Sequence, residues 1–459
     1  MYLSVYIQSR NFNKALFTET ILFRIMLEGP AFLVSRDLPS ACEQECKWAY
    51  NAFCVTGVSK EKCYLDGEET DGSKSSLTPS ENHTQMGDLV ISLSEPDQSD
   101  DQNQSGQSDP TSLINHLGRD LSINCLLHSS RSDYGSIASL NRTFRSLIRG
   151  GELYRLRRLM GIVEHWVYFS CNLFEWEAFD PIRRRWMRLP TMDCNECFMC
   201  SDKESLAVGT ELLVFGKEID THVVYKYSIL TNSWSPGSKT NTPRYLFGSA
   251  SLGVLAIVAG GCGPSGNILS SAELYNSETG TWVTLPDMHK PRKMCSGVFM
   301  ESKFYVIGGI GEENNNELTC GEVYDLETGY WTEIPNMFPA LTGGQDAPAT
   351  AKAPPLLAVV KNELYAAYYE EQEVRKYDKG RNVWVRLGGL PERAGSMNGW
   401  GLAFRACGDQ LIVIAGPRVS YGGMIELNSW VPDENPPQWN LIGRKRSGGF
   451  VYNCAVMGC

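Results

Sequence analysis

Three cysteines in this sequence, Cys194, Cys197 and Cys200, have a C-x2-C-x2-C spacing that raises the question of metal binding. Zinc sites take four ligands, usually supplied as two pairs, and no fourth ligand lies beside these three in the sequence. His222 is the candidate for the missing position. The spacing favours thiols in a loop, and a zinc site completed by His222 is the alternative.

Signatures of catalysis are otherwise missing from the sequence. The part after residue 160 has three histidines, His165, His222 and His289, and they form no His-x-His pair. Nucleophile elbows, phosphate-binding loops and dinucleotide fingerprints are also lacking. We therefore predict a binding protein that is not an enzyme and that has no catalytic site, cofactor or metal.

Basic residues beside prolines form a second candidate site. They recur in the segments that join successive repeats: Arg244, Arg292, Lys293 and Arg393. If the repeats close into a ring, these segments share one rim, where arginine forks suit carboxylates and phosphates. We expect such a basic rim to bind an acidic or phosphorylated segment of a target. The competing interpretation, which the sequence slightly favours, is that each arginine packs against a neighbouring repeat.

The repeat itself has a period near 50 residues. It is marked by six tryptophans at intervals of 48 to 55 residues: Trp186, Trp234, Trp282, Trp331, Trp384 and Trp439. Five of them have an aromatic residue seven positions earlier, and in the sixth unit the counterpart of this aromatic is expected near Leu427. Each unit is predicted to form a sheet of four short strands. Such a sheet cannot bury both of its faces alone, and neighbouring sheets stacked around an axis would cover them. The pattern predicts a mainly β fold, a six-bladed β-propeller over residues 161–459.

The two ends of the predicted propeller complete one blade. The first unit lacks its first strand, and the run at 450–457 resembles the first strand of the other units. We therefore expect this C-terminal strand to pair with the first unit and close the ring.

The N-terminal part is expected to be unlike the propeller. Residues 1–25 precede a second candidate start at Met26 and are interpreted as an extension of the gene model. Residues 26–110 are predicted to be an acidic, mostly disordered leader and linker, because residues 28–110 contain 16 acidic and 5 basic residues and few apolar clusters.

A small all-α module is predicted over residues 111–160, where apolar residues recur at spacings of three and four. The module resembles an F-box, which starts with Leu-Pro-x-Asp-Leu and has a late Trp. Here residues 117–121 read LGRDL, with Gly in place of Pro, and the late aromatic residue is Phe144. With kelch-like repeats after it, the chain resembles plant F-box/kelch-repeat proteins over residues 111–459.

The resemblance implies a substrate-recognition subunit of an SCF-type ubiquitin ligase. The module would bind the Skp adaptor, and through it a cullin ligase, while the propeller holds a target protein. The side chains expected at the adaptor are Leu117, Leu121, Ile123, Leu126, Leu127, Tyr134, Ile137, Leu140 and Phe144. A kelch metal oxidase or small-molecule-modifying propeller is the alternative, and a scaffold that does not direct ubiquitination is a third.

Charge and cysteine content bear on partners and location. The region after residue 160 has 33 acidic and 26 basic residues, which argues against binding to nucleic acid. No run of about 20 apolar residues or secretory signal is present, so we expect no membrane contact. The 15 cysteines are odd in number and scattered, which favours free thiols in a reducing compartment, the nucleus or cytosol.

Overall fold

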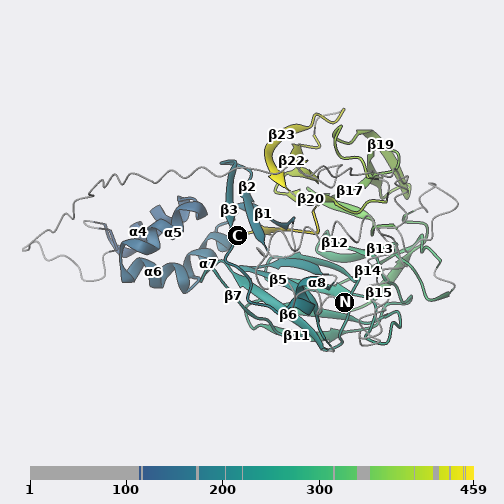
Figure 1. Ribbon diagram of the computed structural model, residues 1–459, viewed down its shortest axis with the longest axis horizontal. Helices are drawn as coiled ribbons and strands as arrows, with labels where there is room; N and C mark the ends of the chain where they lie inside the picture. The colour runs from purple at the N-terminus through teal and green to yellow at the C-terminus, as the bar shows by residue number, and fades with distance from the viewer. Residues whose placement is uncertain are drawn as a thin grey trace, which may run out of the picture. The chain divides into compact units, whose positions relative to one another are not determined.

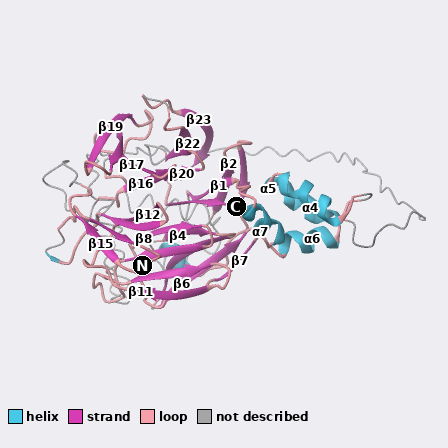
Figure 2. Cartoon of the chain, turned by 180° about the vertical axis from the view of Figure 1, so that it is seen from behind, coloured by secondary structure: helices cyan, strands magenta, loops and turns pink. Residues whose placement is uncertain are grey.

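A computed structural model of the protein describes residues 113–459, with gaps at 115–116, 172–174, 202, 220, 314–315, 339–351, 397, 417–422, 434–435, 448 and 450. Strands dominate this part of the chain, as the magenta elements of Figure 2 show. The predicted six-bladed, mainly β propeller is confirmed. The expectations for residues 1–25 and 26–110 lie outside the described residues. No helix in the described part is long and apolar enough to span a bilayer.

Each blade is a four-stranded antiparallel sheet (Figure 1). In the second to sixth blades the strands pair in chain order, and the first strand of each blade contacts the first strand of the next. The first strands therefore surround the axis of the ring. The strands of these five blades are β4 (Glu204–Val208), β5 (Glu211–Glu218), β6 (Thr221–Ser228) and β7 (Ser233–Pro236); β8 (Gly248–Leu252), β9 (Leu255–Ala259), β10 (Ala272–Asn276) and β11 (Thr281–Leu285); β12 (Ser296–Met300), β13 (Lys303–Ile307), β14 (Gly321–Tyr324) and β15 (Trp331–Ile334); β16 (Leu356–Val360), β17 (Glu363–Tyr368), β18 (Glu373–Asp378) and β19 (Val383–Gly389); and β20 (Leu402–Cys407), β21 (Gln410–Ala415), β22 (Gly423–Trp430) and β23 (Asn440–Ser447).

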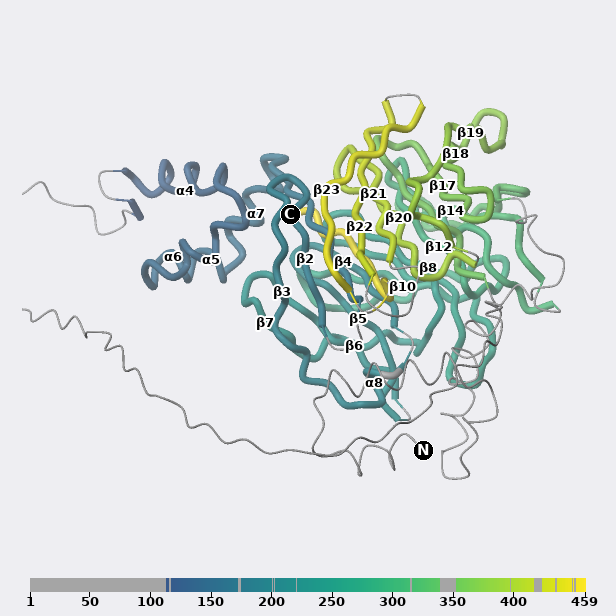
Figure 3. The backbone as a smooth tube through the Cα atoms, turned by 45° about the horizontal axis from the view of Figure 1, so that its top comes forward, coloured from purple at the N-terminus to yellow at the C-terminus, as the bar shows by residue number. Residues whose placement is uncertain are grey.

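The first blade combines the two ends of the propeller. It contains β1 (His165–Ser170), β2 (Trp176–Asp180) and β3 (Arg185–Arg188), and its innermost strand is the last strand of the chain, β24 (Asn453–Gly458). β24 runs antiparallel to β1, with Trp166 opposite Met457. Figure 3 shows the yellow C-terminal strands beside the blue strands of the first blade. The closing strand was expected at 450–457, and Phe450 lies outside the described residues.

The repeated aromatic residues fill the space within and between blades. In every blade the marker tryptophan packs on an aromatic ring of the adjacent strand, with centroids 4.7 to 5.7 Å apart. Five of the six indole N–H groups also donate hydrogen bonds to a backbone carbonyl at the end of the preceding blade. The pairs, at 2.8 to 3.0 Å, are Trp234 to Pro190, Trp282 to Ser238, Trp331 to Pro286, Trp384 to Met337 and Trp439 to Gly389. Each of these five tryptophans therefore joins two blades.

The aromatic partner in the sixth blade is Trp430, and its placement near Leu427 was wrong. Trp430 is opposite Leu411 in the sheet, and its ring lies 5.7 Å from that of Trp439. The connection between β22 and β23 is longer than in the other blades and includes three prolines. This insertion changes the spacing between the two aromatic positions, so a search seven residues before Trp439 fails.

Within the described residues, five helices accompany the propeller strands. Four precede the first blade: α4 (Arg119–His128), α5 (Arg131–Leu140), α6 (Arg142–Arg149) and α7 (Glu152–Leu159). A fifth, α8 (Glu196–Cys200), lies between the first two blades. Side-chain caps define three of these starts, because Ser130 accepts from Ser132 N–H, Asn141 from Phe144 N–H and Asn195 from Phe198 N–H. A helical module at the predicted position is therefore observed.

Candidate functional site

The apolar residues of the helical module divide into a core and an exposed set. Four of the nine side chains expected at an adaptor are buried: Leu126, Leu127, Tyr134 and Phe144. Leu117, Ile123 and Ile137 are half-buried. The expectation that all nine contact an adaptor is corrected here, because side chains buried in the core of the module present no surface to a partner. Leu121, with 59% of its surface exposed, and Leu140, with 71%, remain open.

Sequence reasoning missed other exposed residues of the module. Leu159 and Met160, at the end of α7, are 72% and 55% exposed. Three exposed arginines follow one another along α6: Arg142, Arg145 and Arg149. Spacings of three and four place side chains on one side of a helix. The module therefore offers exposed apolar side chains and a basic helix face, and both signals were present in the periodicity and in the local excess of arginine.

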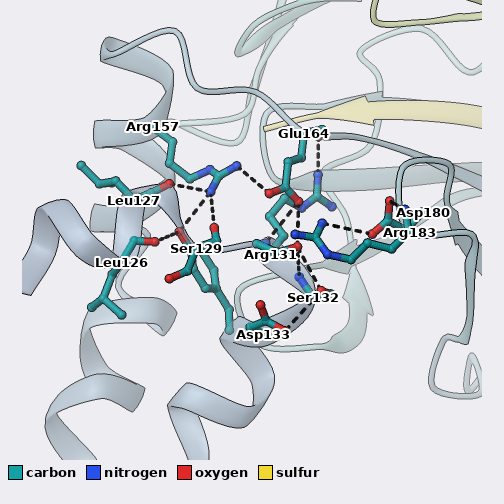
Figure 4. A network of polar contacts seen from close by, with 12 residues as sticks. Leu126, Leu127, Ser129, Arg131, Ser132, Asp133, Arg157, Glu164, Asp180 and Arg183 are labelled. Carbon is teal, nitrogen blue, oxygen red and sulfur yellow. Dashed lines mark hydrogen bonds and ion pairs between the residues drawn. The ribbon is translucent and has the colours of Figure 1, made fainter.

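Arg157 of α7 holds the loop between α4 and α5 from inside the module (Figure 4). Its side chain is 1% exposed, and its Nη1 donates to the carbonyl oxygens of Leu127 and Ser129 at 2.9 and 2.8 Å. Nη2 lies 3.2 Å from Oε1 of Glu164, the residue before the first blade. A buried guanidinium with these partners fixes the orientation of the helices relative to that residue.

Arg131, at the start of α5, attaches the module to the first blade. Its Nη1 donates to the carbonyl oxygen of Glu164 at 2.9 Å, and its Nη2 donates to the hydroxyl of Tyr168 in β1 at 3.0 Å. The guanidinium also lies over the ring of Trp166, 4.3 Å from its centroid. Figure 4 shows Arg131 and Arg157 on either side of Glu164. We call these three residues the arginine clamp; it joins module and propeller through buried contacts.

Two of the three arginines expected on a basic rim, Arg244 and Arg292, are buried. Arg244 donates to the carbonyl oxygens of Gly260 and Ser271 and lies 2.7 Å from Glu273, with both charged side chains 0% exposed. Arg292 repeats this arrangement in the next blade with Gly308, Cys320 and Glu322. The hypothesis that Arg244 and Arg292 face a target is therefore wrong. Each instead attaches the connection leading into its blade to the carbonyl of the glycine that follows the second strand of that blade, Gly260 or Gly308.

The other two rim residues also have partners within the chain. Lys293 is 5% exposed, and its backbone pairs with that of Ile310. Arg393 is 57% exposed and lies 3.2 Å from Glu426, which also pairs with Arg444. Among the four residues of the predicted basic rim, only Arg393 is therefore exposed, and it forms an ion pair with Glu426.

The cysteine motif forms the short helix α8 and its approach. Cys194 is half-buried, Cys197 is exposed, and both belong to the segment between the first two blades. Among the side chains that the structure describes, which exclude that of Cys200, no group of three or more His, Cys, Asp or Glu residues is placed to hold a metal ion. Phe198, from the same helix, is buried against Tyr225 with ring centroids 4.7 Å apart.

Comparison with known proteins agrees with the propeller fold. The kelch motif model matches residues 243–289 and 291–338. The chain is 59% identical to F-box/kelch-repeat protein At1g74510 of Arabidopsis thaliana over 95% of this chain and 100% of that protein. It is 62% identical to F-box/kelch-repeat protein SKIP11 of the same plant over 85% of each. The chain belongs to the F-box/kelch-repeat family.

Proposed function

We propose that this protein is the substrate-recognition subunit of an SCF-type ubiquitin ligase, present in the nucleus or cytosol. The helical module binds a Skp-type adaptor, which connects it to a cullin, and the propeller holds a target protein. The observation that carries the proposal is a set of exposed apolar side chains, Leu140, Leu159 and Met160, on helices held to the propeller by the arginine clamp.

The physical role of such a protein is proximity. It forms and breaks no bonds itself but raises the effective concentration of a target lysine beside a charged ubiquitin-conjugating enzyme. A fixed connection serves this role, because a module that turns freely on the propeller samples many unproductive distances. The buried contacts of Arg131 and Arg157 restrict that freedom. Membership of the F-box/kelch-repeat family supports the same assignment.

The adaptor contact is tested by placing a charge on the exposed apolar set. We expect Leu140→Arg to reduce co-purification of the full chain with a Skp adaptor at least about tenfold, because burying an unpaired charge costs several kcal/mol. Leu121→Arg tests the second exposed leucine separately. Val283→Arg is the matched control, since Val283 is 55% exposed on the outer strand β11. If both leucine variants and the control co-purify with the adaptor equally well, the assignment of this surface fails.

A metal oxidase is the second candidate, and neither the family relationship nor the contacts of the described residues favour it. Metal analysis of the purified full chain separates the two functions. We expect less than one copper or iron ion per chain, and a stoichiometric amount of either would favour the enzyme.

A further inference from the structure

The end of the propeller away from the helical module carries the longer connections. The module leads into β1 at His165, and Arg158 of α7 pairs with Glu278 in the turn between β10 and β11. Strands within a blade alternate in direction, so the connections between second and third strands lie at the opposite end. The connections from one blade to the next lie there too. We call this end the distal rim.

Two glutamates and a lysine meet at the distal rim between the fourth and fifth blades. Glu317 comes from the connection between β13 and β14, and Glu370 from the one between β17 and β18. Lys352 comes from the connection between these two blades, and its Nζ lies 3.7 Å from Glu317 and 3.6 Å from Glu370. The side chains of Lys352 and Glu370 are only 11% and 16% exposed. The two carboxylates thus form a partly buried socket that holds an ammonium group.

Two buried polar atoms at this socket have no hydrogen-bond partner among the described residues. They are Oε2 of Glu370 and the hydroxyl of Tyr369, a residue that is 2% exposed. Burial and the nearby charges of Glu370 and Glu317 raise the pKa of Tyr369, so its phenol stays protonated. Buried polar atoms of native proteins are rarely left without a partner. Here a buried carboxylate oxygen and a buried hydroxyl both have unused hydrogen-bonding capacity.

The socket is held in place by close packing. The amide of Ala353, beside Lys352, donates to the carbonyl of Asn398 at 2.7 Å. Gly399 has a φ of +84°, and a Cβ at this position would lie 2.6 Å from Cε1 of Tyr369. Only glycine allows this approach without strain. The tyrosine ring is therefore fixed from the sixth-blade side, and Glu370 and Glu317 lie near enough to act electrostatically on its hydroxyl.

We propose that this socket, made of Glu317, Tyr369 and Glu370, receives a lysine or arginine side chain of the target in place of Lys352. A target cation that reaches Oε2 of Glu370 and the Tyr369 hydroxyl gains the two contacts that are unfilled, and Lys352 is released to water. The preferred target segment is basic. This reverses the preference expected from a basic rim, because Arg244 and Arg292 are neutralised inside the blades. The inference deepens the proposed function, since it presumes that the propeller holds a target.

The test uses the full chain and a random-peptide display library. We expect selected peptides to share lysine or arginine, and replacing that residue by methionine to weaken binding at least about tenfold in fluorescence polarisation. Glu370→Gln should weaken binding by a similar factor. Lys352→Met should strengthen it about tenfold, because the internal competitor is removed. Glu363→Gln is the matched control. Glu363 begins β17, at the end of this strand away from the socket, and its side chain is 44% exposed.

Selection of acidic or charge-neutral peptides would overturn the inference, and so would equal binding by Glu370→Gln and the wild type. If Glu370→Gln does not fold, Lys352→Met and the methionine-substituted peptides decide the question. Adaptor binding is measured on the same preparations. If the chain binds the adaptor but shows no preference for basic peptides, only the socket proposal is contradicted. If it binds basic peptides but no adaptor, only the proposed ligase function is contradicted.

Discussion

At the scale of single residues, arginine has two opposite roles in this protein. Arg131, Arg157, Arg244 and Arg292 are buried and donate to backbone carbonyls, whereas the arginines along α6 are exposed. The guanidinium suits the buried role because its donors lie in one plane and reach a carbonyl and a carboxylate together. The buried group holds connections and helices in place, and the exposed group is available to partners.

The stability prediction at this scale concerns Arg292. Removing it by Arg292→Met leaves the carboxylate of Glu322 buried, with only the backbone amides of His289 and Lys290 as donors. We expect a loss of about 3–5 kcal/mol in the free energy of unfolding, measured by denaturant titration. Arg292→Met combined with Glu322→Gln should recover part of this loss. Lys379→Met, which removes an exposed pair with Glu301, should change stability by less than about 1 kcal/mol. A similar small change for Arg292→Met would show that the buried pair is not structural.

At the scale of secondary-structure elements, β1 is where the two ends of the chain and the helical module meet. It pairs with β24 on one side and β2 on the other, and the arginine clamp contacts its residues. His165 begins this strand and packs closely on β24, where a Cβ on Gly458 would lie 2.7 Å from its Nε2. Changes at His165 are therefore expected to affect ring closure.

The pH prediction at this scale follows from His165. Burial, and secondly the charge of Arg131, lowers the pKa of His165 below its usual 6.5. The unfolded chain then takes up a proton at a pH where the folded chain does not, so stability falls as the pH drops below about 6.5. We expect the melting-temperature difference between the wild type and His165→Gln to shrink from pH 7.5 to 5.5. A constant difference over that range would mean that His165 does not titrate differently on folding.

At the scale of the whole molecule, the propeller is closed by a single strand. β24 contributes the innermost strand of the first blade and contacts the inner strands of both neighbouring blades, β20 and β4. Its backbone covers the only edge of β1 that β2 leaves open. An unpaired strand edge is prone to aggregation, so closure determines solubility as well as stability.

Truncation tests this closure. A chain ending at Arg446 loses β24, and we expect it to aggregate or to melt well below the full chain, measured by light scattering and circular dichroism. A milder change to the contact between the last and first blades is possible at Gly443 of β23. A Cβ at this position would lie 3.0 Å from Phe179 and 3.1 Å from Trp186 of the first blade. Gly443→Ala should therefore cost about 1–3 kcal/mol. An unchanged melting curve for the truncated chain would contradict closure by the C-terminal strand.

The sequence alone determined the repeat and therefore the architecture. Tryptophans at regular spacing must occupy equivalent positions, and four-stranded units with two apolar faces can be covered only by stacking around an axis. The helical module was also readable, because its apolar residues keep the helical period. Blade six was partly misread, since a longer hairpin moved Trp430 out of the expected spacing.

Only the tertiary structure decided which charged and apolar side chains are available. Glu273 and Glu322, the partners of Arg244 and Arg292, lie about thirty residues further along the chain and meet them only after the blade has folded. The helical period predicts one apolar face, but it does not say that Leu126 and Phe144 turn inward while Leu140 stays open. The residues of the socket, Glu317, Tyr369 and Glu370, come from two different blades. Burial and long-range pairing are properties of the packed chain, and they have no local signature in the sequence.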